Sequence, residues 1–375
     1  MGDDCDQCPG HADPRSTPIV TGPGANTSEF LTRFSMSPDG ERVVYLEFGA
    51  PGFELFSVPT SGGAPVRLSM PLSPRRDVLD YAISPDGARV VFLADEASDD
   101  VFEIYSVPIA GGPATKLNGP LVVGGSVTRP FRISADGGRV VYLADQDTGD
   151  VLEAFVAPID GSLPALKLAG PPVWSATAHG IILTAPGTHV LYHADPNGDG
   201  MDLFSVPVTG APAVNLSGAI GGRVLQFTVS PDGARAAYTV FAAGPGEPLY
   251  SVPVTGGAST RLNPASAAGP VVSLLVDPAG SRLVYSANQE AQFDTELYSV
   301  PLSGGPVTKL SLPVEIVGVD SFQITPDGAS VVYRGDHPAN PGDRDLFIVR
   351  IAGGSVTRLT APQIPEGEAW DFSIT

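Results

Sequence analysis

The feature that most constrains this chain is a tetrapeptide of the SPDG type that returns seven times at nearly equal intervals. The final glycines of the seven copies are 46 to 50 residues apart, and they are Gly40, Gly87, Gly137, Gly187, Gly233, Gly280 and Gly328. An aromatic residue stands five positions after each glycine, and a second aromatic recurs in a later segment of the ELYSVP type. A period of roughly 20 to 50 residues is typical of solenoids, propellers and other repeat arrays.

Each repeat contains four short apolar runs, which in the first unit are residues 34–37, 42–46, 54–59 and 66–69. Their alternation and β-branched content predict four strands, A to D, and the PDG and GG sequences predict tight turns. With 44 glycines and 38 prolines among 375 residues, no sizeable helical domain fits the chain. Radial stacking of four-stranded sheets buries their inner faces. We therefore predict an all-β fold, a seven-bladed β-propeller of antiparallel blades that forms a single domain over residues 17–375.

Both ends of the repeat array carry an extra strand-like segment. Residues 372–375 match residues 322–325 of a strand A, and residues 17–23 align with a strand D at residues 115–120. We favour seven blades with a strand exchanged where the ring closes; the alternatives are an eight-bladed or incomplete ring, and strand exchange between two chains. Residues 1–16 are expected to be a flexible acidic leader, whose Cys5 and Cys8 form a CxxC motif.

The repeat signatures ISPDGxRVVYLAD and ELYSVPxxGGxxxKL resemble the TolB-type, WD-repeat-like β-propeller repeat of bacteria. The resemblance covers about residues 30–375. It implies a propeller that is periplasmic, secreted or at the cell surface. Propellers of this kind serve as interaction scaffolds, as accessory domains of serine peptidases and occasionally as lyases, so the resemblance does not fix the function.

The charge balance restricts the partners. The chain has 41 acidic residues against 21 Lys and Arg, a net charge of −20. Nucleic acid is excluded as a partner because phosphate binding draws most of its affinity from Lys and Arg; a protein or a cationic partner fits better. No run of about 18 apolar residues occurs, so the sequence predicts no membrane span.

Six repeats place an acid two residues before the strand C aromatic, and all three lysines of the chain occupy one slot on strand D. Opposite charges on neighbouring antiparallel strands stabilise a sheet by roughly 0.2–1 kcal/mol per pair. We therefore predict a structural ladder rather than catalytic carboxylates at Glu54, Glu103, Glu153, Asp202, Glu296 and Asp345.

Further acids gather in the expected B–C loops and predict a negative face. Among them, Asp195, Asn197 and Asp199 resemble the DxNxDG opening of a calcium loop, since a hard cation needs oxygen ligands at alternate positions. The pattern of Asp145, Asp147 and Asp150 is similar. Neither has flanking helices, and Val206 stands where the calcium loop has its twelfth-position Glu, so a solvated hairpin loop is the alternative to calcium.

The expected D–A loops contain the least repetitive polar residues, which would line the mouth of the propeller channel. These candidate ligand residues are Arg129, His179, Arg223, Asp320 and Trp370. Such a mouth suits a small anion or a sugar, and the alternative is that they are ordinary loop residues. A GxSxG nucleophile elbow is absent, and no other catalytic motif was found.

Three functions remain open from the sequence. The first is a non-catalytic scaffold that binds a protein or other extracytoplasmic partner through the acidic loop face. The second is a propeller enzyme, either a lyase or a glycan-active hydrolase, that acts at the channel mouth. The third is a structural module of a larger surface assembly.

Overall fold

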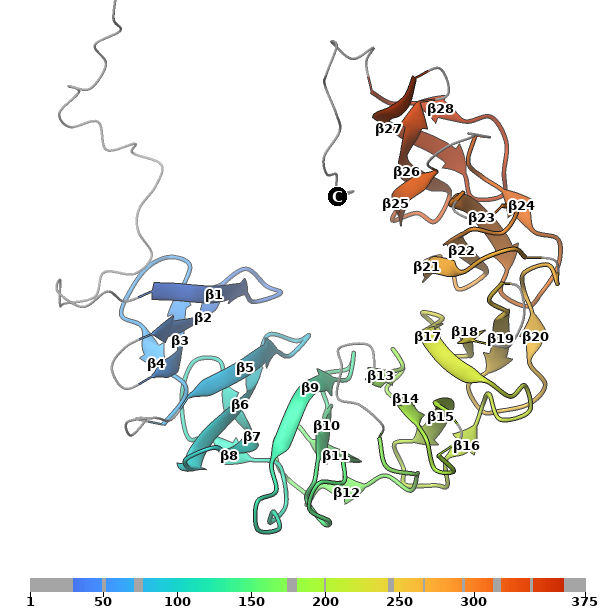
Figure 1. Ribbon diagram of the computed structural model, residues 1–375. Coiled ribbons are helices and arrows are strands. Elements are labelled where there is room, and N and C mark those ends of the chain that lie inside the picture. The colour runs from blue at the N-terminus through green and yellow to red at the C-terminus, as the bar shows by residue number, and fades with distance from the viewer. Residues whose placement is uncertain are drawn as a thin grey trace, which may run out of the picture. The chain divides into compact units, whose positions relative to one another are not determined.

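The computed structural model describes residues 30–48, 52–70, 77–173, 181–198, 200–241, 246–265, 267–291, 294–312, 318–337 and 340–360. In these ranges every regular element is a β-strand, and the strands form seven four-stranded antiparallel sheets (Figure 1). Each sheet pairs four strands that are consecutive in the chain. The four strands predicted for each repeat are confirmed, and each sheet is called a blade below. Residues 1–16, for which a flexible leader is expected, lie outside the described ranges.

The chain divides into two compact units, residues 1–119 with 158–164, and residues 120–157 with 165–375. The first unit holds blade 1, with β1 (Phe30–Met36), β2 (Arg42–Phe48), β3 (Phe53–Pro59) and β4 (Val66–Arg67), and blade 2, with β5 (Val78–Ile83), β6 (Arg89–Ser98), β7 (Val101–Pro108) and β8 (Thr115–Lys116).

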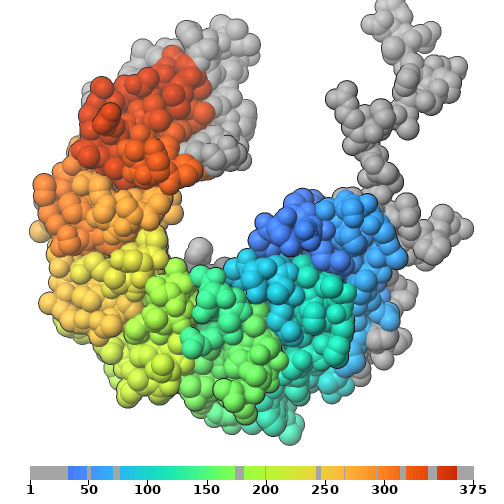
Figure 2. Space-filling view, turned by 180° about the vertical axis from the view of Figure 1, so that it is seen from behind, coloured from blue at the N-terminus to red at the C-terminus, as the bar shows by residue number. Residues whose placement is uncertain are grey.

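The second unit holds blades 3 to 7, which follow one another in chain order (Figure 1, Figure 2). Blade 3 has β9 (Val127–Ile133), β10 (Arg139–Ala144), β11 (Glu153–Pro158) and β12 (Leu166–Lys167), and blade 4 has β13 (Ile181–Leu183), β14 (His189–Ala194), β15 (Asp202–Pro207) and β16 (Val214–Asn215). Blade 5 has β17 (Arg223–Val229), β18 (Arg235–Phe241), β19 (Leu249–Pro253) and β20 (Thr260–Arg261). Blade 6 has β21 (Val271–Val276), β22 (Arg282–Ala287), β23 (Glu296–Pro301) and β24 (Thr308–Lys309), and blade 7 has β25 (Val319–Ile324), β26 (Ser330–His337), β27 (Asn340–Arg350) and β28 (Thr357–Arg358).

The SPDG tetrapeptides form the A–B turns. In blade 1, Ser37 Oγ donates to Asp39 Oδ1 at 2.5 Å and accepts the Arg42 N–H at 2.9 Å, while Gly40 has a φ of 72°. The hydroxyl–carboxylate contact recurs in the turns that begin at Ser84, Ser134, Ser230 and Thr325. The Ser37 hydroxyl and the Glu41 N–H hold the pKa of Asp39 below its usual range. Each turn is therefore closed by its own side chains.

The two recurring aromatic slots lie on strands B and C and pair within each blade. All seven pairs are stacked, with ring centroids 5.2 to 6.2 Å apart. The pairs are Tyr45–Phe56, Phe92–Tyr105, Tyr142–Phe155, Tyr192–Phe204, Tyr238–Tyr250, Tyr285–Tyr298 and Tyr333–Phe347. Stacked pairs of this kind add about 0.5–1.5 kcal/mol beyond the area they bury.

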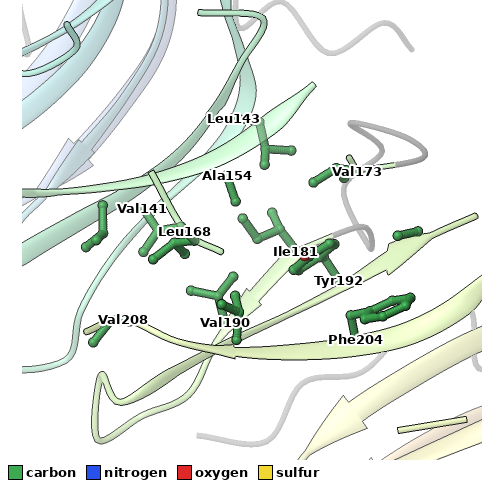
Figure 3. Packing of buried hydrophobic residues seen from close by; sticks show 13 residues of the cluster. Val141, Leu143, Ala154, Leu168, Val173, Ile181, Val190, Tyr192, Phe204 and Val208 are labelled. Carbon is green, nitrogen blue, oxygen red and sulfur yellow. The ribbon is translucent and has the colours of Figure 1, made fainter. Parts of the chain in front are cut away.

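The hydrophobic core lies between consecutive blades. Between blades 3 and 4, Val141 and Leu168 pack against Ile181, Val190 and Tyr192 (Figure 3). Clusters of the same kind join blade 1 to 2, 4 to 5, 5 to 6 and 6 to 7. Full burial of one Leu or Val stabilises by about 1.5–3 kcal/mol, so each blade depends on its neighbour for stability.

Candidate functional site

The predicted charge ladder between strands C and D is present. Glu103 Oε1 lies 2.8 Å from Lys116 Nζ, and Glu296 Oε1 lies 2.8 Å from Lys309 Nζ. The corresponding pairs in other blades are Glu54–Arg67, Glu153–Lys167, Asp345–Arg358 and the uncharged hydrogen bond from Asn215 to Asp202. The recurring acids of strand C therefore have strand D side chains of the same blade as partners.

A second polar position, directly after the strand D leucine, extends the ladder. Ser217 Oγ accepts the Leu203 N–H at 2.9 Å and donates to Asp202 Oδ1 at 2.8 Å. Ser311 does the same for the Leu297 N–H and for Glu296. Burial raises the pKa of Glu296 despite its contacts with Lys309 and Ser311. Sequence reasoning missed this position, although a Ser, Asn or Thr recurs there in six repeats.

Asp95, Asp145 and Asp195 share one repeat slot, three residues after the strand B aromatic. Asp145 accepts the Ser126 N–H at 2.5 Å and the Asp150 N–H at 3.3 Å, and Asp95 accepts the corresponding amides of Asp77 and Asp100. These carboxylates close the B–C hairpin onto the start of strand A. Both carboxylates thus hold backbone amides of their hairpins, and the recurrence of Asp at that slot is the sequence signal for this contact. Calcium at Asp145, Asp147 and Asp150 stays a prediction.

A smaller set of acids is exposed at the tips of the B–C hairpins of blades 2 and 3. Asp99, Asp100 and Asp150 are exposed, and none of them forms a salt bridge with a described residue, whereas the exposed Asp147 pairs with Lys167 at 3.1 Å. Asp100 and Asp150 have φ values of 60° and 61°, so each occupies the left-handed position of its turn. The negative face expected from the loops is thus narrower than the sequence indicates, because the neighbouring Glu96 is buried and accepts the Met70 N–H.

The calcium candidates have other contacts in the structure. Asp195 Oδ1 accepts the Gly200 N–H at 3.3 Å, Asn197 is exposed, and Asp199 lies outside the described residues. Asn197, Asp202 and Asn215 line a cavity of about 160 Å³. Within the described ranges no three His, Cys, Asp or Glu side chains come together as a metal site. Calcium at residues 195–199 stays a prediction, because it depends on Asp199.

The structure corrects the placement of the channel-mouth candidates. Arg129 lies within β9, Arg223 is the first residue of β17 and Asp320 is the second residue of β25, so these three belong to strands A rather than to D–A loops. Strand A begins earlier than its apolar run suggests because it extends to pair with strand B, as Arg223 does with Phe241. His179 and Trp370 lie outside the described residues.

Asp320 belongs to a network of alternating charge on blade 7. Its Oδ2 accepts bonds from Arg334 Nη2 and from Arg344 Nε, both at 2.9 Å, and Arg344 also pairs with the buried Asp336. Both contacts of this carboxylate oxygen are thus ion pairs with arginines of β26 and β27 in the same blade. In the described part of blade 7 the contacts of Asp320 are therefore those of a structural residue.

His193 is buried where blades 4 and 5 meet. Its ring centroid lies 4.9 Å from that of Phe227, and its Nε2 has no hydrogen-bond partner among the residues that the structure describes. Burial, with a smaller effect of the Arg223 charge, lowers the pKa of His193 to about 4. The imidazole is therefore neutral near pH 7.

Comparisons with known proteins address the fold. A structure of Porphyromonas gingivalis dipeptidyl peptidase 4 matches with a TM-score of 0.61 and 14% sequence identity, over 88% of this chain and 52% of the peptidase. A structure described as the eukaryotic initiation factor matches with a TM-score of 0.51 and 12% identity, over 89% of both chains. The chain has the fold of a seven-bladed β-propeller.

A TolB from Agrobacterium tumefaciens also matches, with 18% identity and a TM-score of 0.33, over 76% of this chain and 81% of that protein. This propeller spans about half the length of the matched dipeptidyl peptidase, and identities this low show the fold alone. No protein-family model and no curated protein matches the sequence. The described residues contain no helix long and apolar enough to cross a membrane.

Proposed function

We propose that this propeller is a non-catalytic scaffold whose individual B–C hairpins each bind a cationic protein surface through their exposed acids. The observation that carries the proposal is the contrast between two sets of acids. Acids on strand C form ion pairs with Lys or Arg in five blades and accept a hydrogen bond from Asn215 in a sixth, whereas Asp99, Asp100 and Asp150 are exposed and form no salt bridge with a described residue. Exposed acids that form no ion pair within the blades can form ion pairs with a cationic partner.

The hairpins that carry these acids are held in place. The carboxylates of Asp95 and Asp145 fix the backbone of the two tips, so the exposed acids change position little when a partner arrives. Preorganised loops on a rigid scaffold lose less conformational entropy on binding. A net charge of −20 would also speed the association with a basic partner at low salt.

An extracytoplasmic location, which the resemblance to TolB-type repeats implies, is part of this proposal. The enzyme alternative depends on Arg129, His179 and Asp320 at the channel mouth. The two guanidinium groups on Asp320 do not favour it. The third alternative, a structural module of a larger surface assembly, depends on the extra strand-like segments at residues 17–23 and 372–375.

Charge-neutral substitution tests the proposal. The variant with Asp99→Asn, Asp100→Asn and Asp150→Asn removes three hairpin charges, and Asn tolerates the left-handed φ at two of the sites. A lysine-rich peptide serves as the probe in calorimetric titration at low salt. The matched control, with Glu41→Gln, Asp136→Asn and Asp327→Asn, removes three exposed charges from the A–B turn regions. We expect weaker peptide binding in the hairpin variant alone. An equal loss of affinity in both variants would show that the B–C hairpins are not the specific binding site.

A further inference from the structure

The leucine of strand D is buried at every blade junction within a unit and exposed on blade 7. Leu359 is 51% exposed. The equivalent residues are 1–4% exposed, and they are Leu68, Leu168, Leu216, Leu262 and Leu310. Within the described residues, Leu359 of blade 7 therefore lacks the covering side chain that its counterparts have.

The rest of that face is open as well. Leu346 of β27 is partly exposed, whereas its counterparts Leu203, Leu249 and Leu297 are fully buried. Ile348, which lies on the same side of the strand by alternation, lines a cavity of about 380 Å³ together with Arg350 and Thr357. An open apolar face on an otherwise complete sheet indicates that something packs on it.

At the other junctions the cover is strand A of the following repeat. Leu310 packs with Phe322, Leu262 with Leu274, and Leu216 with Phe227. Blades 1 and 2 show the same arrangement with Leu68 and Tyr81, and blades 3 and 4 show it with Leu168 and Ile181. In these five cases the covering residue follows the leucine by 11 to 13 positions.

We infer that residues 371–375 cover the face of blade 7, with Phe372 seated on Leu346 and Leu359. Phe372 follows Leu359 by 13 positions, within the range set by the other junctions, and its segment FSIT repeats the FQIT of β25. The segment thus has the residue type, the spacing and the strand pattern of the covers at the other junctions. It acts as an eighth strand A that shields blade 7.

The test is hydrogen exchange of the full-length protein, followed by mass spectrometry of peptides that span residues 346–360. Phe372→Asp should speed amide exchange at Leu359, whose N–H donates to the Leu346 carbonyl at 2.8 Å, by about tenfold. Phe372→Leu should restore protection, because Leu274 occupies the same slot in blade 6. Ser373→Asp is the matched control, since alternation places its side chain on the opposite side of the strand.

Three results would overturn the inference. The first is equal exchange at residues 346–360 in Phe372→Asp and Ser373→Asp. The second is unchanged exchange after deletion of residues 371–375. The third is protection that disappears on dilution, because a second copy of the chain would then be the cover.

Discussion

Glu296 is 2% exposed at its side chain, and its Oε1 lies 2.8 Å from the Nζ of the more accessible Lys309. Ser311 donates a hydrogen bond to the other oxygen of the same carboxylate. The pair joins strand C to strand D in blade 6 and, with Asp345 and Arg358 of blade 7, is one of the two most buried ion pairs of the ladder. Its geometry explains why an acid and a base return at fixed repeat positions, because the two side chains join neighbouring strands of the blade.

Loss of the Lys309 charge should destabilise the protein. Lys309→Met leaves a buried carboxylate without its cation, at a cost of about 3 kcal/mol. The more exposed pair of Glu54 and Arg67, at 3.3 Å, provides the control, and Arg67→Met should cost less than about 1 kcal/mol. Urea unfolding measures both free energies. If both variants lost the same small amount of unfolding free energy, the burial of Glu296 would not contribute to the strength of its ion pair.

His193 should make the protein acid-sensitive. Its folded pKa is about 4, against 6.5 for an ordinary His, so the unfolded chain binds a proton over this interval while the native state does not. Stability is unaffected by this group above pH 6.5 and falls by up to about 3 kcal/mol as the pH drops to 4. His193→Leu, which copies Leu143 of blade 3, should remove that part of the pH dependence of unfolding. A pH profile identical to wild type would contradict the assignment.

His189→Arg should stabilise blade 4. In blade 1 the strand B Arg42 Nε donates to Ser57 Oγ at 2.7 Å, and the same contact recurs between Arg282 and Ser299. His189 stands in the Arg position, and no described residue forms a hydrogen bond with the buried Ser205 Oγ. Restoring the donor should add about 1 kcal/mol to the free energy of unfolding. Ser205→Ala, which removes the orphaned hydroxyl, should be neutral or stabilising, and a loss in both variants would refute this explanation.

Gly304 should tolerate a methyl group less well than Gly62. Both have positive φ, 94° and 88°, so the backbone strain of an alanine is matched. A Cβ on Gly304 would lie 2.7 Å from Thr260 Cγ2 of the preceding blade, whereas none of the described atoms lies within 4 Å of a Cβ on Gly62. Gly304→Ala should therefore lower stability by about 1–3 kcal/mol more than Gly62→Ala. Equal melting temperatures of the two variants would contradict close packing between blades.

The repeat register made much of the fold predictable. Residues that stand at the same place in every unit, such as Tyr285 with Tyr298 or Glu103 with Lys116, have partners that follow from strand alternation alone. Asp320 could not be placed this way, because Arg334 and Arg344 occupy positions that are not basic in the other repeats. The contacts of Asp145 could not be placed by alternation either, because its partners are the backbone amides of Ser126 and Asp150, and only the recurrence of Asp at its slot marks it in the sequence.

The salt dependence of binding tests the proposed function most directly. The affinity for a lysine-rich peptide is measured at several salt concentrations for wild type and for the two triple variants, hairpin and A–B turn. At 0.1 M salt, interactions between exposed charges more than about 10 Å apart are largely screened, so wild type and the A–B turn variant should lose affinity steeply as salt rises. The hairpin variant, without Asp99, Asp100 and Asp150 carboxylates, should bind weakly and show a shallow slope. If its affinity and slope equal those of the A–B turn variant, the B–C hairpins are not the binding surface.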